Sequence, residues 1–228
     1  MKDKVVVITG GQGNLGRAVA HAFQAAGCRL ALIDHGAVPQ TGESDRYLSV
    51  GEIDLTQWAH AERAMQTIVA RYGRIDVLVN IAGGFLWQTL AEGELAGWDQ
   101  MYDINLKTAV AASKAALPSI LKSDAGRIIN IGAGAAAKAA AGMGAYAAAK
   151  SGVLRLTESL SEEVKDRGVT VNAILPGTID TPQNRKAMPK ADTSRWVVPE
   201  AIADVVVFLA SDGARAVTGA AVPVFGRG

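Results

Sequence analysis

The pair of side chains best suited to proton transfer is Tyr146 and Lys150, which are four residues apart in Tyr-Ala-Ala-Ala-Lys. In a helix, this spacing places a phenol and an ammonium one turn apart on the same face. A free tyrosine has a pKa of about 10, which is too high for efficient proton transfer near neutral pH. A positive charge one turn away stabilises the phenolate, so we expect Lys150 to lower the pKa of Tyr146. The pair therefore predicts a general acid and base, although the spacing alone is common.

A glycine-rich turn near the N-terminus predicts a dinucleotide-binding loop. It follows the short apolar run 5–9 and opens a helical pattern at 17–26. Glycines let the chain turn tightly, let the backbone approach a pyrophosphate and let the helix pack closely on the strand. The free N–H groups and the dipole of the helix N-terminus favour the phosphates. The residues expected at the pyrophosphate are Gly10, Gly13, Asn14, Leu15 and Gly16.

An acidic residue at the end of the second predicted strand indicates which nicotinamide nucleotide is bound. Asp34 can accept hydrogen bonds from the adenosine ribose and would repel a 2′-phosphate, which favours NAD(H) over NADP(H). Two alternatives stay open: Asp34 could cap a helix, and Arg17 or Arg29 could serve a 2′-phosphate. Asp54 suits a contact with the adenine edge and an N-cap for the helix expected from Thr56 equally well.

Strand-like and helix-like segments alternate along the whole chain, and this alternation predicts the fold. We expect one domain over residues 1–228, of α/β class, with a Rossmann-like, doubly wound parallel sheet and helices on both faces. Residues 183–196, which are polar and charged, are expected to form a mobile flap over the nicotinamide end. The predicted strands are 5–9, 29–33, 47–53, 77–80, 126–131, 169–175 and 217–224, and the predicted helices are 17–26, 56–72, 95–121 (one long helix or two in sequence), 145–166 and 199–210.

Composition excludes several classes of function. The chain has 228 residues, 49% of them hydrophobic, and a formal net charge of +1, so nothing indicates binding to nucleic acid or to a membrane surface. The single cysteine, Cys28, rules out an internal disulfide and a cysteine-based metal cluster, which favours the cytoplasm. The scattered histidines His21, His35 and His60 argue against a metal site. The N-terminal apolar run is too short for a signal peptide or a membrane span.

The order and spacing of several motifs resemble the short-chain dehydrogenase/reductase family over essentially the whole chain. Besides the glycine turn and the Tyr146–Lys150 pair, the motifs are Asn80-Ile81-Ala82-Gly83 after a strand, Asn105 in a long helix, and Pro176-Gly177-Thr178-Ile179-Asp180-Thr181 after a later strand.

This resemblance implies a role for each matching residue. Tyr146 would be the general acid and base, Lys150 would bind the nicotinamide ribose hydroxyls, and Asn105 would hold a water that relays protons. Asn105 could instead be a polar residue satisfied inside a helix pair. Members are typically dimers or tetramers that pack through their long helices, so a homo-oligomer is implied. Asn80, Ala82 and Gly83 would line the adenosine side, and Pro176, Gly177, Ile179 and Thr181 would hold the nicotinamide carboxamide.

One position departs from the family pattern. The family usually has a serine thirteen residues before the tyrosine, where it donates to the substrate carbonyl oxygen, but this chain has Ala133 there. No serine or threonine lies between Asp124 and Tyr146 to replace it. Loss of one such donor typically costs about a hundredfold or more in rate. Either the enzyme is impaired on ordinary ketones, or its substrate does not need that donor.

A second resemblance, to the dihydropteridine reductase branch of the family, favours the latter explanation. It is carried by Ala82-Gly83-Gly84-Phe85-Leu86-Trp87, by Gly142-Met143, and by Asp180-Thr181-Pro182-Gln183-Asn184-Arg185-Lys186-Ala187-Met188-Pro189 through Trp196. That branch also lacks the serine and uses NADH to reduce quinonoid dihydropterin, whose ring nitrogens take up the charge. Ala133, Trp87 and Met188 would then face the substrate, with Trp87 as a planar wall or else a partly buried loop aromatic. The glycine turn, Asn105 and residues 217–224 resemble ordinary members instead.

The sequence therefore leaves three functions open. The first is an NADH-dependent reductase of a conjugated imine or carbonyl, with quinonoid dihydropterin as the leading substrate. The second is a general NAD(P)-dependent alcohol dehydrogenase or ketoreductase in which water or backbone replaces the missing hydroxyl. The third is a non-catalytic NAD(H)-sensing module, which has no need of a proton relay through Tyr146, Lys150 and Asn105.

Overall fold

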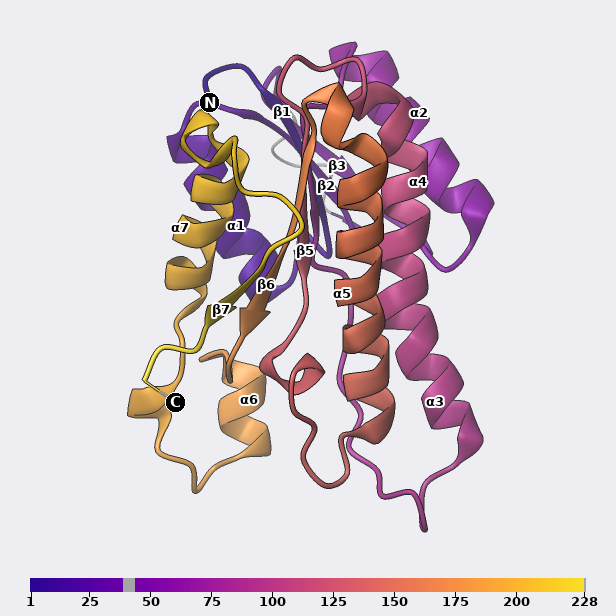
Figure 1. The fold of residues 1–228 in the computed structure, drawn as a ribbon, viewed down its shortest axis with the longest axis vertical. Coiled ribbons are helices and arrows are strands. Elements are labelled where there is room, and N and C mark those ends of the chain that lie inside the picture. The colour runs from indigo at the N-terminus through magenta and orange to yellow at the C-terminus, as the bar shows by residue number, and fades with distance from the viewer. Residues whose placement is uncertain (39–43, 228) are drawn as a thin grey trace.

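Seven parallel strands form one sheet in the order β3-β2-β1-β4-β5-β6-β7 within residues 1–38 and 44–227, which a computed structural model describes. The chain leaves β1 in one direction, through β2 and β3, and then returns past it to β4 and the remaining strands (Figure 1). In folds of this class, the crevice that binds ligands lies at such a reversal, which here falls at the carboxyl ends of β1 and β4. The strands are β1 (Val5–Thr9), β2 (Arg29–Ile33), β3 (Tyr47–Val50), β4 (Val77–Asn80), β5 (Arg127–Ile131), β6 (Thr170–Pro176) and β7 (Ala221–Val224).

Helices cover both faces of the sheet, as the alternating pattern predicted. Figure 1 shows α1 (Asn14–Ala25) and α7 (Pro199–Ala210) on one side, and α2 (Trp58–Tyr72), α4 (Thr108–Ile120) and α5 (Gly144–Val164) on the other. The side chains of β1 alternate between the two cores: Val5 and Val7 join the α2/α4 side, and Val6 and Ile8 join the α1/α7 side. Burial on both faces explains why β1 is a continuous apolar run.

The region predicted at 95–121 as one long helix or two in sequence contains two α-helices joined by a π-helical turn. It consists of α3 (Leu95–Tyr102), a π-helical turn (Asp103–Lys107) and α4. The amide Nδ2 of Asn105 donates to the carbonyl oxygen of Met101 at 3.1 Å, which is the acceptor that the backbone N–H of residue 105 would use in an α-helix. This side-chain bond accounts for the wider turn, which apolar periodicity does not reveal.

Two predicted strands are shorter than expected. β3 ends at Val50 because Glu52 has a φ of 56°, a left-handed conformation incompatible with a strand. β7 begins at Ala221 rather than at residue 217, because Gly219 has a φ of 70° and breaks the extended run. The predicted polar loop between β2 and β3 falls partly on residues 39–43, outside the described residues.

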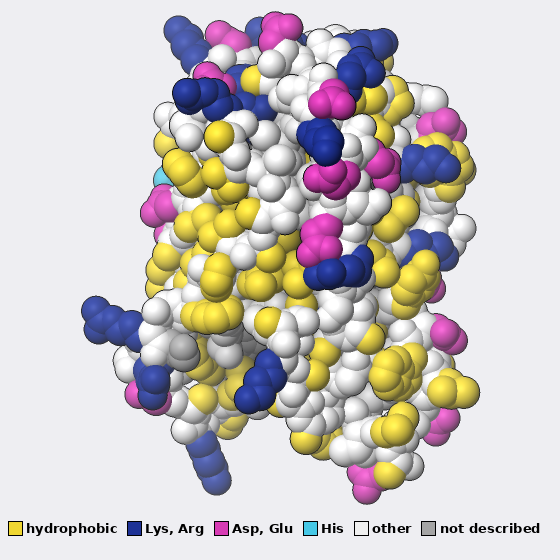
Figure 2. Space-filling model, viewed as in Figure 1, with side chains coloured by type: hydrophobic (Ala, Val, Ile, Leu, Met, Phe, Trp, Pro, Cys, Tyr) yellow, Lys and Arg dark blue, Asp and Glu magenta, His cyan; other side chains and the backbone are white. Residues whose placement is uncertain are grey.

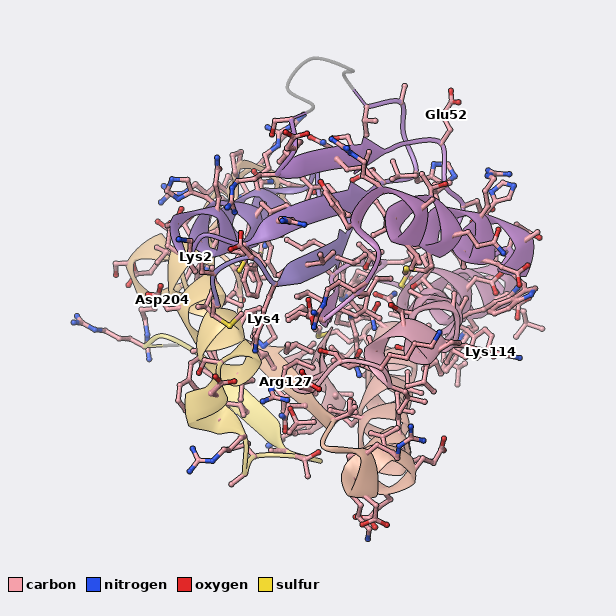
Figure 3. The ribbon with its side chains drawn as sticks, turned by 90° about the horizontal axis from the view of Figure 1, so that it is seen from above. Lys2, Lys4, Glu52, Lys114, Arg127 and Asp204 are labelled. Carbon is pink, nitrogen blue, oxygen red and sulfur yellow. The ribbon has the colours of Figure 1, made fainter. Side chains whose placement is uncertain are left out.

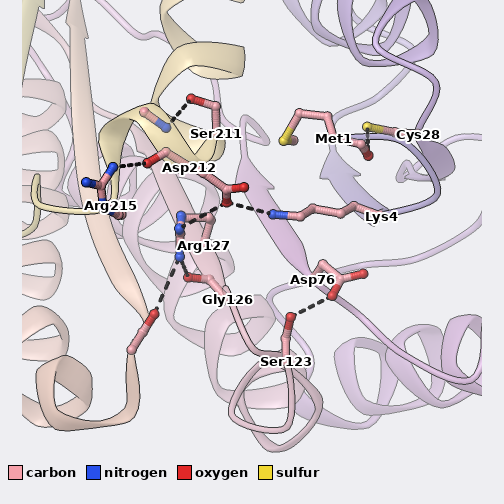
Figure 4. A network of polar contacts seen from close by, with 12 residues as sticks. Met1, Lys4, Cys28, Asp76, Ser123, Gly126, Arg127, Ser211, Asp212 and Arg215 are labelled. Atoms are coloured by element: carbon pink, nitrogen blue, oxygen red, sulfur yellow. Dashed lines mark hydrogen bonds and ion pairs between the residues drawn. The ribbon is translucent and has the colours of Figure 1, made fainter.

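A polar network lies at the amino-terminal ends of the strands, away from the carboxyl ends where the candidate site lies. Ser123 donates to the buried Asp76 at 2.6 Å, and the Asp212 carboxylate lies 3.4 Å from Lys4 and 3.9 Å from Arg127 (Figure 4). Figure 3, which looks at the molecule from above, labels Lys4 and Arg127 at this end. These charged groups therefore link the amino-terminal ends of the strands, at the end of the sheet opposite the candidate site.

In the described part of the chain, no helix is both long and apolar enough to span a membrane.

Candidate active site

Tyr146 and Lys150 lie in the first turns of α5, on the same side of the helix. The Nζ atom of Lys150 is 5.9 Å from the centroid of the Tyr146 ring. Lys150 is only 5% exposed, and its Nζ donates to the carbonyl oxygen of Ile131 at 2.8 Å. The ammonium is thus held at the carboxyl end of β5, next to the phenol, as the helical spacing predicted.

The electrostatics of this pair differ from the expectation. Burial raises the pKa of Tyr146 to about 12 and lowers the pKa of Lys150 to about 8. We expected Lys150 to lower the pKa of Tyr146, but the pKa is raised, because burial removes the phenol from solvent and disfavours the phenolate. The phenol is protonated at neutral pH, as the proton donor in a reduction must be, but its raised pKa makes it a weaker acid than a free tyrosine.

Asn105 fastens the loop after β4 to the α3–α4 helix. Its Nδ2 donates to the carbonyl oxygen of Gly84 at 3.0 Å, and its Oδ1 accepts from the backbone N–H of Gly84 at 3.2 Å. A Cβ atom on Gly83 would lie 2.6 Å from this Oδ1 and 3.5 Å from the Nζ of Lys150. Gly83 therefore has to be glycine for Asn105 and Lys150 to approach the loop. Both ends of the Asn105 amide have protein partners, and the water relay stays a prediction.

Trp87 lies in the same loop and is held by its indole N–H. This Nε1 donates to the carbonyl oxygen of Ala141 at 3.1 Å, while the side chain is 58% exposed. The next residue, Gln88, donates its backbone N–H to the carbonyl oxygen of Gly142 at 2.9 Å. The structure thus places Trp87 at the surface near α5, and its role as a planar wall for the substrate stays a prediction.

Phe85 is a site residue that the sequence reasoning missed. Its ring centroid lies 5.0 Å from that of Tyr146, and the two ring planes meet at 83°. The available signal was an aromatic residue two positions after Asn-Ile-Ala-Gly, but only the path of the loop shows that it reaches Tyr146.

Ala133 is buried just beyond the end of β5 and brings no hydroxyl to the site. Ser151, on α5, donates its hydroxyl to the carbonyl oxygen of Ala136 at 2.9 Å, so that hydroxyl is directed to the backbone. Next to Ala133, a Cβ on Gly134 would lie 3.1 Å from the ring of Phe225. A buried methyl group therefore stands where the family serine would be, and the ring of Phe225 lies beside the next residue.

The glycine turn has the shape that a pyrophosphate requires. Gly10 has a φ of 66°, and a Cβ on it would lie 3.1 Å from the backbone of Ala82. A Cβ on Gly16 would lie 2.8 Å from Cα of Gly11, so only glycine allows α1 to pack this closely. The α1 N-cap, Gly13, makes no side-chain capping bond, which leaves the first N–H groups of the helix for an anion. These residues fit a nicotinamide dinucleotide.

Within this turn, the five predicted pyrophosphate residues divide by exposure. Gly13 and Asn14 are exposed at the start of α1, whereas the Leu15 side chain and Gly16 are buried beneath it. Leu15 can therefore offer only its backbone N–H to a phosphate.

Asp34 faces the glycine turn rather than a helix end. Its Oδ2 accepts from the backbone N–H of Gln12 at 2.9 Å, and its Oδ1 accepts a longer bond of 3.4 Å from Gly36. Arg29 begins β2, whereas Asp34 follows the end of that strand. Arg29 therefore lies at the opposite end of β2 and cannot reach a 2′-phosphate next to Asp34. Arg17 lies exposed in the first turns of α1 and remains the alternative cation.

Asp54 does not cap α2, whose N-cap is Gln57 and has no side-chain capping bond. Its Oδ1 accepts from the backbone N–H and the hydroxyl of Thr56 at 2.9 and 2.7 Å, in the turn before α2. The hydroxyl bond lowers the pKa of Asp54. The helix expected from Thr56 begins at Trp58, and a contact of Asp54 with adenine stays a prediction.

The side chain of Asn80 is buried in the core instead of lining the crevice. Its Nδ2 donates to Ser113 on α4 at 3.0 Å and to Asn130 on β5 at 2.8 Å. Asn130 in turn donates to Thr157 on α5 at 2.9 Å. Asn80 therefore joins β4 and β5 to the two helices that carry the site, and the crevice surface after β4 is formed by Ala82 and Gly83.

The segment after β6 is fastened at both ends. Thr181 caps α6 (Pro182–Ala187) by accepting from Asn184 at 3.1 Å, and Arg185 forms two bonds of 2.6 and 2.8 Å with Asp180. At the far end, Arg195 donates to the carbonyl oxygen of Arg227 at 3.1 Å.

Between these attachments, none of residues 181–196 is buried, and Met188 lies exposed at the end of α6. Pro176, Gly177 and Ile179 lead from β6 into this segment, where Ile179 bridges to Val197. Mobility of a flap at 183–196 stays a prediction.

In the described ranges, no group of three or more His, Cys, Asp or Glu side chains is placed to hold a metal ion.

Comparison with known proteins gives one consistent result. The model of the short chain dehydrogenase family matches residues 4–192. The 2-(S)-hydroxypropyl-CoM dehydrogenase 3 of Xanthobacter autotrophicus is 34% identical over 99% of this chain and 96% of its own length. Among solved structures, the aldohexose dehydrogenase of Thermoplasma acidophilum has a TM-score of 0.89 at 30% identity, covering 99% of this chain and 94% of the other. A levodione reductase has a TM-score of 0.90 at 28% identity, covering 99% and 97%.

Proposed function

The chain belongs to the short-chain dehydrogenase/reductase family and is an NAD(P)-dependent oxidoreductase, and we propose that it uses NADH to reduce a planar, conjugated imine or carbonyl compound. The leading substrate is a quinonoid dihydropterin. The observation that carries this proposal is Ala133, which places an apolar side chain where a hydroxyl would polarise a carbonyl oxygen. A conjugated imine spreads the incoming charge over its ring nitrogens and so needs a proton donor but no such hydroxyl.

Each residue of the site has a separate role in the proposed reduction. The nicotinamide cofactor supplies the hydride. Tyr146 holds the proton on its phenol, because burial keeps its pKa well above neutral pH, and donates it to the substrate. Lys150, fixed by the carbonyl oxygen of Ile131, is placed to bind ribose hydroxyls and to stabilise the phenolate that remains. Asn105 holds Gly84 and with it the loop beside the phenol.

The preference for NADH rests on Asp34. Its carboxylate lies beside the glycine turn through its bond to Gln12, where it would repel a 2′-phosphate. Arg29 lies at the opposite end of β2, so of these two arginines only Arg17, on α1, could counteract this repulsion.

The main alternative is an alcohol dehydrogenase or ketoreductase. The similar proteins from Xanthobacter and Thermoplasma are dehydrogenases, and the levodione reductase also has another substrate, which favours this alternative. In that case water or a backbone N–H has to replace the hydroxyl that Ala133 lacks.

A substrate panel assayed with NADH and NADPH side by side tests the proposal. We expect turnover of quinonoid dihydropterin with NADH, weaker turnover with NADPH, and loss of both in Tyr146→Phe. The same panel should be repeated with Ala133→Ser. A gain of about a hundredfold on simple ketones, with no pterin turnover in either protein, would establish the ketoreductase instead.

If no substrate gives turnover that Tyr146→Phe abolishes, the chain is better described as an NAD(H)-sensing module. Binding of NADH to the parent, measured by calorimetry, separates that case from a misfolded preparation.

We also propose a cytoplasmic homodimer or homotetramer. The cytoplasmic location rests on the single, buried cysteine Cys28. The homo-oligomer rests on a long-helix stripe, which consists of exposed apolar side chains that follow one another along α3 and α4, namely Leu95, Trp98, Tyr102 and Val110.

A further inference from the structure

Phe85 presents an exposed aromatic ring directly beside the phenol of Tyr146. The ring centroids are 5.0 Å apart, the planes meet at 83°, and 56% of the Phe85 surface is exposed. A perpendicular contact occupies one edge or one face of Phe85 and leaves a face open. We propose that this open face is the surface on which the substrate stacks, so that the site selects a planar, conjugated ring over a saturated one.

The backbone on the N-terminal side of Phe85 is fixed. Gly84 exchanges two hydrogen bonds, of 3.0 and 3.2 Å, with the buried side chain of Asn105. A Cβ on Gly84 would lie 2.9 Å from Cδ1 of Ile104, so the loop packs closely against this helix. The residue before Phe85 is therefore held against the α3–α4 helix by the two bonds to Asn105.

The loop is also fixed on the C-terminal side of Phe85. Trp87 donates its indole N–H to Ala141 at 3.1 Å, and Gln88 donates its backbone N–H to Gly142 at 2.9 Å. These bonds attach the loop to the segment that leads into α5 and Tyr146. The backbone on both sides of this exposed ring is already fixed before a ligand binds. Stacking of a ligand therefore costs little further conformational freedom, which favours binding.

Phe208 provides the comparison within the same chain. It is similarly exposed, at 53%, but lies on α7. Within residues 1–38 and 44–227, the Phe85–Tyr146 pair is the one contact between aromatic rings, and Phe208 takes no part in any. Phe208 is thus an ordinary surface hydrophobe, while Phe85 lies where a substrate must come to reach the Tyr146 phenol.

This inference rests on the proposed function at one point, namely that the substrate accepts its proton from Tyr146. A ring that reaches the phenol oxygen also approaches the open face of Phe85. Aromatic pairs are stabilised beyond their buried area by an amount that corresponds to about tenfold in affinity. We therefore expect Phe85 to set the affinity for planar rings and to leave the affinity for NADH unchanged.

Ligand binding to the enzyme saturated with NAD⁺, measured by isothermal titration calorimetry, tests the inference. Oxidised pterin is the planar probe and cyclohexanone the saturated one. Phe85→Leu removes the ring, Phe85→Tyr retains it, and Phe208→Leu is the matched control. We expect Phe85→Leu to weaken pterin binding about tenfold, with Phe85→Tyr and Phe208→Leu within about twofold of the parent. Cyclohexanone should bind all four proteins alike, and thermal unfolding should show that each is folded.

The inference is overturned if the parent does not bind pterin, if Phe85→Leu binds pterin as well as the parent, or if it loses both probes equally. Turnover of quinonoid dihydropterin is then measured separately. Phe85-dependent pterin binding without turnover would leave the stacking surface standing and defeat the proposed reaction. Turnover with unchanged KM in Phe85→Leu would leave the reaction standing and defeat the stacking surface.

Discussion

At the scale of single residues, Lys150 is a charged group kept in the protein interior. Its Nζ has one protein acceptor, the carbonyl oxygen of Ile131, and burial lowers its pKa to about 8. A lysine in such a place reduces the free energy of unfolding, because the folded state has to bury the charge or release the proton. A buried lysine with a shifted pKa therefore indicates a role in binding or catalysis rather than in stability.

The first prediction concerns the pH dependence of stability. The unfolded chain has a lysine pKa of about 10.5 and the folded chain one of about 8, so between these values the unfolded state binds more protons and stability rises with pH. The full shift corresponds to about 3 kcal/mol. Above pH 10, Tyr146, whose pKa rises from 10.0 to about 12, has the opposite effect. The useful window is therefore pH 8 to about 10.

Urea unfolding of the parent and of Lys150→Met across this window is the measurement. We expect the rise in the parent to disappear in the variant, which should be inactive yet more stable than the parent at pH 7. Lys107→Met, which changes an exposed lysine paired with Asp103, is the control and should keep the rise. Parallel pH curves for the parent and Lys150→Met would contradict the burial argument.

The sequence predicted contacts between residues of the same helix better than contacts between different segments. Tyr146 and Lys150 were predicted together because a helix fixes side chains four apart. Phe85 was not, because its contact with Tyr146 depends on the path of a loop. The burial that raises the Tyr146 pKa was missed for the same reason, since it comes from segments distant in sequence.

At the scale of elements, the loop after β4 and the segment before α5 behave as one unit. Gly142 lies where the two meet: its φ is 76°, and a Cβ there would collide with the Trp87 indole. Gly168 has a similar φ of 71°, but a Cβ on it would meet nothing within 4 Å. An alanine at either position would strain the backbone, but only an alanine at position 142 would also contact Trp87, so comparing the two substitutions distinguishes the two effects.

The second prediction concerns this pair of glycines. Gly168→Ala and Gly142→Ala should each lose about 1–2 kcal/mol of unfolding free energy, because alanine is strained in the left-handed region. Only Gly142→Ala should also displace Trp87 and raise KM for the planar substrate several-fold. Urea unfolding and steady-state kinetics on both variants provide the measurement. Equal KM values in the two variants would show that the position of Trp87 does not matter to the substrate.

The sequence predicted elements well where burial alone defines them. The apolar runs of β1, β2 and β4 match the observed strands because both of their faces are covered. The α3–α4 region was predicted less well, because the side-chain bond from Asn105 to Met101 decides the π-helical turn. A single competing hydrogen bond of this kind leaves no trace in hydrophobic periodicity.

At the scale of the whole molecule, two exposed apolar surfaces are available for association. One is the long-helix stripe on α3 and α4. The other lies on the face shown in Figure 2, where hydrophobic side chains gather between α7 and α5. The helix α7 carries the exposed Phe208. Exposed apolar surfaces of this kind mark sites of protein association.

The third prediction distinguishes these surfaces. If subunits associate through their long helices, Val110→Asp should place a charge in the interface and yield monomers in analytical ultracentrifugation. Phe208→Asp should leave that dimer intact and at most prevent two dimers from joining. A parent that sediments as a monomer at micromolar concentration would contradict the proposed homo-oligomer, and a dimer lost in Phe208→Asp alone would assign the interface to α7.

The π-helical turn between α3 and α4 accommodates one residue more than a regular helix would. A π-helical turn contains about one residue more than an α-helical turn, so loss of Asn105 would let the segment return to α-helix with α3 and α4 keeping nearly the same rotation. Leu95, Tyr102 and Val110 would then stay in line, whereas Gly84 would lose both of its bonds to the Asn105 side chain. The residue that widens the helix therefore serves the active-site loop, and the proposed subunit contact could form without it.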